Sequence, residues 1–296
     1  MVSDRIEFSL VENALDYFKQ AAIHAETDSP REWKYALLHT VAGIELLLKA
    51  RLECEDWTLV CKDPGKVSHE RYERGDFESI DYQTALERLR ELDINIDETV
   101  RAKLKPLRIH RNKVQHFALQ ADKAVLTPLI AVGFNFGIDF IGKELSAYVD
   151  REGERAIQEV SMKLRGFEEF IRERRETISP ELAGALNIWD CPRCWQDALV
   201  FGKGDPRCAF CLFEAAPAAL AKEIGYEMGP EECPHCDEQD YCFVLANNEA
   251  GEWRCFSCGA CGGYSVCSEC GRGSTEELIG GICSDCFIDK VNRRNT

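Results

Sequence analysis

Apolar residues recur about once per helical turn through the first half of the chain. In the first helix that this spacing predicts, which Ser3 or Asp4 would cap and which ends near Glu26, they are Ile6, Leu10, Leu15, Phe18 and Ile23. The next predicted helix is apolar around most of its circumference and is expected to form the core. The full set of these helices covers residues 3–26, 31–54, 84–92, 98–119 and 126–149. No segment here reads as a strand, so we expect an all-α bundle of four to five helices.

Glycine and proline positions refine this bundle. Residues 55–80 are polar and interrupted by Pro64, Gly65 and Gly75, so a loop is predicted there. Gly133 and Gly137 form a G-x-x-x-G pattern, which predicts a close crossing of two helices.

A further amphipathic helix is predicted over residues 155–178. Its apolar positions follow a 3-4-3-4 spacing, at Ile157, Val160, Leu164, Phe167 and Ile171. The repeat is shorter than three heptads, which favours packing on the bundle over an independent coiled coil.

The second half of the chain differs in composition and pattern, because short strand-like runs alternate there with cysteine pairs. Fourteen of the 16 cysteines lie between Cys191 and Cys286, and only Cys54 and Cys61 precede them. Residues 187–296 hold 9 basic and 18 acidic side chains, a net charge of −9. We therefore divide the chain into a helical bundle (1–150), a connecting amphipathic helix (151–186) and a cysteine-rich region (187–296).

Twelve cysteines of this region form six C-x-x-C pairs, which couple in order with 13, 18 and 12 residues between the members of each couple. Two such knuckles on a hairpin present four thiolates tetrahedrally, as a structural zinc site requires. The pattern predicts three tandem zinc ribbons, which are small β-hairpin modules, and about three structural zinc ions per chain. The predicted ligands are Cys191, Cys194, Cys208, Cys211, Cys233, Cys236, Cys255, Cys258, Cys267, Cys270, Cys283 and Cys286.

Other readings of these cysteines remain open at this stage. Disulfides and iron–sulfur ligation are the alternatives to zinc. Cys242, which follows Tyr241 in an expected strand, is predicted to be a buried thiol. Cys261 could replace a ligand and shift the pairing, and His235 could coordinate from within its knuckle.

The net charge of −16 and the absence of an apolar leader in the first residues predict a cytoplasmic protein. The most apolar stretch, residues 126–142, is about 17 residues long and shorter than the ~20 of a membrane span, so we expect a buried helix and no membrane partner. The acidic ribbons, made more negative by four thiolates per zinc ion, favour a protein-binding role over contacts with phosphate.

One segment of this acidic chain carries a strongly positive charge. Residues 100–118, VRAKLKPLRIHRNKVQHFA, contain no acidic residue, two histidines and six cations: Arg101, Lys103, Lys105, Arg108, Arg111 and Lys113. Arg111 falls within the apolar stripe that Leu104, Leu107, Val114 and Ala118 form on this helix, and an unpaired buried charge is costly. One interpretation is a core arginine paired with Glu45. Asn112 and His116 lie four residues apart and share a helix face, so Asn112 could orient the imidazole.

The sequence RNKVQH, with Arg111, Asn112 and His116, resembles the R-polar-x-x-x-H motif of HEPN domains. The apolar segment AGIELLLKARL is similar to that family's core helix, and the resemblance covers about residues 5–150. It implies a HEPN-like helical bundle and metal-independent RNA cleavage. His116 would then act on the 2′-hydroxyl or the leaving oxygen, Arg111 would stabilise the phosphate charge, and Asn112 would orient His116 or the substrate.

The resemblance also implies a homodimer, because the family builds its site from two motifs and this chain has one. Toxin or defence functions are common in the family. The basic residues Arg101, Lys103, Lys105, Arg108 and Lys113 are predicted to contact RNA, with the zinc ribbons serving for targeting or regulation. Two other functions remain: a non-catalytic dimeric adaptor and a nucleic-acid-binding regulator.

Overall fold

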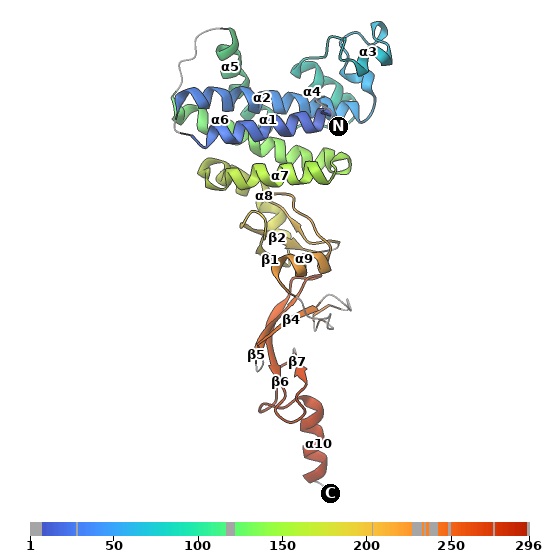
Figure 1. Cartoon of the computed structure of the whole chain (residues 1–296), viewed down its shortest axis with the longest axis vertical. Coiled ribbons are helices and arrows are strands. Elements are labelled where there is room, and N and C mark those ends of the chain that lie inside the picture. The colour runs from blue at the N-terminus through green and yellow to red at the C-terminus, as the bar shows by residue number, and fades with distance from the viewer. Residues whose placement is uncertain are drawn as a thin grey trace, which may run out of the picture. The chain divides into compact units, whose positions relative to one another are not determined.

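The computed structural model describes residues 8–27, 29–116, 122–202, 204–226, 233, 235–236, 242–247, 250–274 and 276–294. The chain divides into two compact units, residues 1–177 and 178–296 (Figure 1). The division falls within α8 (Glu168–Gly184).

The first unit is a helical bundle, as predicted, and its described residues contain no strand. Besides the start of α8, its helices are α1 (Leu10–Ala25), α2 (Pro30–Glu53), α3 (His69–Glu73), α4 (Tyr82–Glu91), α5 (Glu98–His116), α6 (Lys123–Phe140) and α7 (Arg151–Lys163). The predicted core helix, α2, is the centre of the bundle: it contacts α1 along its length and also α4, α5 and α6 (Figure 1). On α1, the other side is covered by α7.

Local capping fixes where the first two helices begin. The predicted start of α1 near Ser3 was wrong, because Ser9 is the N-cap: its Oγ accepts from the Glu12 amide at 3.2 Å, and Glu12 Oε2 accepts from the Ser9 amide at 2.6 Å. Ser3, Asp4 and Ile6 lie outside the described residues. Pro30 opens α2, where its missing N–H and fixed φ suit the first turn, as predicted.

The segment 55–80 is more ordered than the predicted loop. It contains two short 3₁₀ turns and α3, and its ends are joined by a bridge between Cys61 and Ser79. From α4, Arg88 Nη1 donates to the carbonyl oxygens of Leu59 at 2.6 Å and of Cys61 at 2.9 Å. A cation on a neighbouring helix thus satisfies backbone acceptors that a regular element would have paired internally.

The single helix predicted over 155–178 was also wrong, because the chain breaks at a 3₁₀ turn, Leu164–Gly166, between α7 and α8. The turn changes which side chains face the bundle. Phe167 meets the Trp33 ring edge-on at 5.9 Å, and Phe170, outside the predicted 3-4-3-4 set, is fully buried against Phe134. These contacts compensate the broken helical hydrogen bonds.

Two glycines let α6 approach its neighbours closely, as the G-x-x-x-G pattern predicted. A Cβ on Gly133 would lie 2.3 Å from Thr40 Cγ2 on α2, and one on Gly137 would lie 2.5 Å from Phe18 Cζ on α1. The Phe18 ring also lies against Gly43. The ring therefore fills a slot between two helices that lack side chains at the contact.

The most apolar helix ends earlier than predicted, at Phe140, and continues as a π-helical turn (Ile141–Leu145) and a 3₁₀ turn (Ser146–Tyr148). Residues 123–148 are long and apolar enough to cross a membrane by length and composition alone, and 67% of their most apolar window is buried by the rest of the protein. Neighbouring helices thus cover most of this apolar surface.

Arg174 on α8 is the most deeply buried cation among the described residues of the bundle, with 2% of its surface exposed. Its Nη1 lies 3.5 Å from Asp139 Oδ1 and 3.4 Å from Asn135 Oδ1, both on α6. Nearby, Asn135 Nδ2 donates to Thr177 Oγ1 at 2.8 Å, and Lys103 on α5 pairs with Glu173. A polar network therefore joins α8 to α5 and α6 where apolar packing alone would leave the charge unpaired.

The second unit contains two small antiparallel sheets beside the cysteine clusters, as the ribbon pattern predicted. The first has the order β1 (Asn187–Asp190), β2 (Asp197–Phe201), β3 (Arg207–Cys208), and the second β4 (Cys242–Asn247), β5 (Ala250–Cys255), β6 (Cys261–Val266), β7 (Gly273–Ser274). Two helices complete the described part, α9 (Pro217–Ile224) and α10 (Ser284–Arg294).

We predict that Gly137→Ala lowers the stability of the bundle by about 1–3 kcal/mol, because its Cβ overpacks the Phe18 slot. Chemical denaturation followed by circular dichroism at 222 nm measures this. Gly184→Ala is the control, since a Cβ there meets nothing within 4 Å. Equal midpoints for wild type and Gly137→Ala would show that the slot can relax.

Candidate metal centres and the Arg111–His116 helix

Among the described residues, four C-x-x-C pairs share one backbone turn: those that begin at Cys191, Cys208, Cys255 and Cys267. In each, the backbone amide of the residue that follows the second cysteine donates to the carbonyl oxygen of the first cysteine at 2.9 Å. The residue after the second cysteine is left-handed in all four, with φ between 62° and 75°: Trp195, Leu212, Gly259 and Gly271. The next carbonyl then accepts from the first cysteine's amide at 2.7–2.8 Å.

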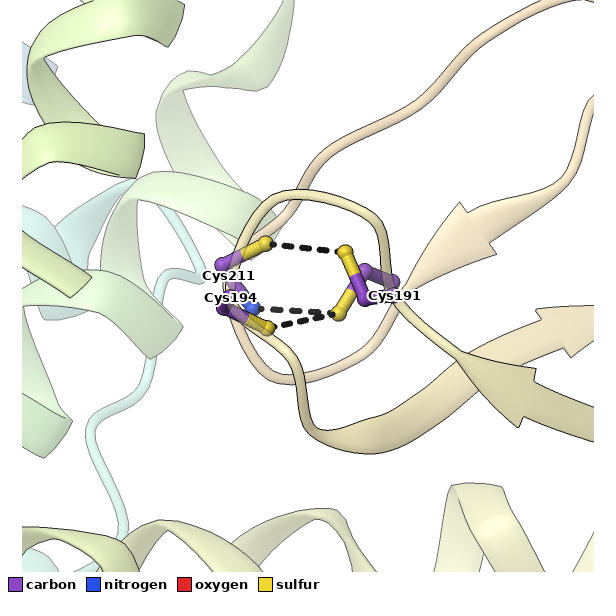
Figure 2. A group of neighbouring side chains, drawn as sticks. Cys191, Cys194 and Cys211 are labelled. Atoms are coloured by element: carbon purple, nitrogen blue, oxygen red, sulfur yellow. Dashed lines mark hydrogen bonds between the residues drawn. The ribbon is translucent and has the colours of Figure 1, made fainter. Parts of the chain in front are cut away.

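The first cluster joins Cys191 and Cys194, between β1 and β2, to Cys208 and Cys211, after β2. All four are buried, and Figure 2 shows Cys191, Cys194 and Cys211 turned toward one another. Cys191 Sγ lies 3.7 Å from Cys211 Sγ, and Cys194 Sγ lies 3.7 Å from Cys208 Sγ. Backbone amides of Arg193 and Cys211 point at the Cys191 and Cys208 sulfurs from 3.4 and 3.5 Å.

The second and third clusters repeat this arrangement with the predicted partners. Their members are Cys233, Cys236, Cys255 and Cys258, and then Cys267, Cys270, Cys283 and Cys286. Across the knuckles of the second cluster, Cys233 Sγ lies 3.8 Å from Cys258 Sγ and Cys236 Sγ lies 3.7 Å from Cys255 Sγ. In the third, Cys270 Sγ lies 3.8 Å from Cys283 Sγ. In the third, the Cys283 and Cys270 amides donate to Cys267 Sγ and lower the pKa of that thiol to about 6, which favours the metal-binding thiolate.

These spacings fit a tetrahedral metal ion. Four sulfurs each about 2.3 Å from a central ion, the length of a zinc–sulfur bond, lie about 3.8 Å from one another. The four sulfurs of each cluster lie within 4.8 Å of one another. Within the first cluster, hydrogen bonding lowers the pKa of Cys191 and raises the pKa of Cys208 and Cys211, because four thiolates this close cannot all ionise without a cation. Each cluster could therefore hold one metal ion.

The remaining cysteines stay outside these clusters. Cys261 is exposed and does not replace a ligand. His235 lies in its knuckle but stacks on the Trp253 ring at 5.6 Å instead of joining the sulfurs. The side chain of Cys242 lies outside the described residues, and Cys61 is buried in the bundle with burial raising the pKa of its thiol.

The first two ribbons are fastened together. Asn187 Nδ2 donates to the Cys258 carbonyl at 2.9 Å, and Trp189 Nε1 donates to the Gly259 carbonyl at 2.9 Å. Gly259 leaves no room for a side chain, since a Cβ there would lie 2.6 Å from the Phe201 ring. A knuckle of the second ribbon thus packs directly on the sheet of the first.

The predicted catalytic residues lie at the end of α5. Arg111 is half-buried, and its Nη1 donates to Asn112 Oδ1 at 3.0 Å, while Asn112 and His116 are exposed. Glu45 pairs with Lys49 on its own helix at 2.8 Å, and Arg111 has no ion pair with any described residue. The interpretation of Arg111 as a core cation paired with Glu45 was therefore wrong. Asn112 thus accepts a hydrogen bond from Arg111, and its predicted role in orienting His116 stays a prediction.

The predicted RNA-contacting residues divide between two sides of α5. At 100° per residue, Arg101, Lys105, Arg108, Asn112 and His116 fall within an arc of ~80°. We call these five residues the basic face of α5. Lys103 lies on the opposite side with Glu173, and Lys113 is exposed between the two. On the basic face, Arg101 pairs with Glu98 at 3.1 Å and Arg108 lies over the Tyr82 ring at 3.8 Å.

Sequence reasoning missed two features of these regions. The left-handed residue after each knuckle is visible in the sequence only where it is glycine, at Gly259 and Gly271, and not at Trp195 or Leu212. The buried Arg174 carried no signal, because it stands among exposed charges in the sequence. Comparison with family models, curated proteins and solved structures found no match to this chain.

We predict three metal ions per chain, because each cluster supplies four sulfurs at tetrahedral spacing. Elemental analysis of the purified protein measures the number and identifies the element. Cys191→Ser should leave two ions and unfold the first ribbon while the helical signal of residues 1–177 persists.

Cys261→Ser is the matched control for that variant. It removes an exposed thiol of the same region that belongs to no cluster, so three ions should remain. One ion or fewer per wild-type chain would contradict the three-site assignment.

Proposed function

We propose that this protein is a metal-independent endoribonuclease of the HEPN type whose C-terminal clusters hold structural zinc. The observation that carries the proposal is Arg111. This arginine has no acidic partner among the described residues, touches Asn112, and precedes an exposed His116 on the same helix. A cation left without a neutralising carboxylate is available for a phosphate.

The basic face of α5 supports RNA as the substrate. Lys105 has no ion-pair partner among the described residues, and the guanidinium of Arg108 lies over the Tyr82 ring, which orients it without cancelling its charge. These cations stand in line with Asn112 and His116 along about three turns of helix. An RNA backbone following this line would meet positive charge before it reaches the imidazole.

RNA carries its own nucleophile, which limits what the protein must supply. The 2′-oxygen forms a bond to phosphorus, the bond from phosphorus to the 5′-oxygen breaks, and the proton of the 2′-hydroxyl is balanced by one delivered to the leaving oxygen. An imidazole can take the first proton or give the second near neutral pH. Arg111 would stabilise the charge on the non-bridging oxygens. The products are a 2′,3′-cyclic phosphate and a 5′-hydroxyl.

A homodimer follows from the same chemistry. The attacking and leaving oxygens lie on opposite sides of phosphorus, so one imidazole cannot serve both at once. The chain has one R-polar-x-x-x-H motif, and a second copy of α5 would supply the other histidine. Ile109, 46% exposed beside the basic face, gives this helix apolar surface for such a contact.

Zinc is the proposed metal because four cysteines on paired knuckles form its preferred structural site, with no open position for catalysis. A non-catalytic adaptor is the second candidate. It is favoured by the acidic ribbons, since three sites of four thiolates and Zn²⁺ would each add about −2 to a region at −9.

We expect Arg111→Ala and His116→Ala each to lower the rate of RNA cleavage, by about 10²–10³-fold and 10²–10⁴-fold, because one removes the phosphate cation and the other the proton-transfer group. Cleavage of a labelled RNA in buffer with EDTA, resolved on denaturing gels, measures these rates. Arg111→Lys should also be slow, because an ammonium cannot bind phosphate in two places.

Arg90→Ala is the matched control, since it removes an exposed arginine of α4 and should leave the rate unchanged. DNA of the same sequence should survive for lack of a 2′-hydroxyl. Wild-type rates in both alanine variants would contradict the proposed ribonuclease site. Loss of cleavage on chelation while the fold persists would contradict a metal-independent reaction.

We also predict a homodimer at ~10 µM, where dimers with sub-micromolar Kd persist. Sedimentation velocity of the full chain measures its mass. Ile109→Asp should shift the protein toward monomer and slow cleavage together, because it places a charge in the proposed contact. A strictly monomeric wild type that still cleaves RNA would contradict a site shared between two copies.

A further inference from the structure

A groove of about 610 Å³ lies in the second unit where the first two ribbons meet. We call it the ribbon groove. Its apolar surface comes from Ile188, Trp189, Trp195 and Ile224, and two carboxylates, Asp190 and Asp197, stand among them. The lining is completed by Pro192, Arg254, Cys261 and one member of the first cysteine cluster, Cys191.

The walls of the ribbon groove are fixed by neighbouring contacts. Trp189 donates to the Gly259 carbonyl at 2.9 Å, packs on the Phe201 ring at 4.4 Å and meets the Phe256 ring edge-on at 5.2 Å. The guanidinium of Arg254 lies over its remaining face at 5.2 Å. The groove is therefore formed before a ligand arrives, which reduces the ordering cost of binding.

The fold does not explain why residue 195 is a tryptophan. It takes the left-handed position after a knuckle, with φ 64°, where the second and third ribbons have Gly259 and Gly271. A bulky residue there is strained relative to glycine. Its indole is 73% exposed, so burial does not offset the strain, and the hydrogen bond of its amide to Cys191 could be made by any residue but proline. The side chain is therefore placed for an external contact.

The charges of the groove specify the ligand. Asp190 and Asp197 are cross-strand partners of β1 and β2, and like charges in this position repel. Arg254, the cation in the lining, is paired with Glu252 at 3.1 Å, so the two carboxylates outnumber it. Asp190 has no ion pair with a described residue. The surrounding region has a net charge of −9, to which the thiolate sites add. Phosphate would be repelled, whereas a cation would relieve the repulsion.

We propose that the ribbon groove binds a basic segment of a partner protein, with an Arg or Lys side chain stacked on Trp195 and paired with Asp190 and Asp197. Arg254 is occupied on Trp189, which leaves Trp195 as the open aromatic face. The apolar side chains of Ile188 and Ile224 would receive the residues that flank the cation. This assignment does not depend on RNA cleavage by the bundle.

Fluorescence anisotropy with a labelled peptide of five Gly-Arg repeats, and a second of five Gly-Lys repeats, tests the groove on the intact protein. Trp195→Gly should weaken binding of the tighter peptide by about tenfold or more, because it removes the stacked ring. It should not lower the thermal midpoint, because glycine relieves the left-handed strain. Leu212→Gly, which makes the same change at the matching knuckle position outside the groove, should leave binding unchanged.

The charge contribution is tested with two double variants that change the net charge equally. Asp190→Asn with Asp197→Asn should weaken peptide binding by about fivefold or more. Glu276→Gln with Glu277→Gln removes two exposed carboxylates of the same region and should have less than a twofold effect.

Three results would overturn the proposal. The first is no binding of either peptide at ~100 µM, the second is equal binding by wild type and both groove variants. The third is decauridylate binding that is tighter than peptide binding and lost in Trp195→Gly, which would make the groove a nucleic-acid site.

Discussion

Four sulfur atoms held about 3.7 Å apart cannot remain together as bare thiolates, and the second unit depends on what resolves this repulsion. Each cluster joins two knuckles that are separated by 12 to 18 residues, so sulfur–metal bonds would also close the hairpins between them. The amides of Arg193, His235 and Cys283 point at sulfurs from 3.3–3.4 Å and share the charge. Metal ligation, hydrogen bonds from backbone amides and the left-handed turn would thus act together to hold the four sulfurs in place.

The bundle depends on apolar packing instead, and this difference decides what its sequence could predict. Helix period is a local signal, so α2, α4 and α5 were found within a few residues. The break between α7 and α8 was missed because it is stabilised by contacts distant in sequence, Trp33 with Phe167 and Phe134 with Phe170. The helical period of 155–178 continues across the turn, so the pattern alone could not place it.

The same distinction applies to the candidate sites. All twelve ligands were predicted with their partners, because a tetrahedral ion requires a fixed spacing that is visible in the sequence. Helix geometry alone predicts the basic face of α5. It does not predict the partner of Arg111, because side-chain packing decides between Glu45 and Asn112. The ribbon groove had no local signal, because Trp189, which lines it, is held by the carbonyl of Gly259, 70 residues away.

Electrostatics separates the two kinds of ligand that this chain can attract. An ion held by four thiolates would leave each cluster negative, so binding of zinc would deepen the charge of a region that already has twice as many acidic as basic residues. As the clusters bind metal ions, the affinity of that region for RNA would fall, whereas its affinity for a basic peptide would rise. On α5 the sign is opposite, because residues 100–118 have no acidic side chain. The proposed RNA and the proposed basic peptide would therefore be directed to different parts of the chain, and metal binding at the clusters would strengthen this separation without any change at α5.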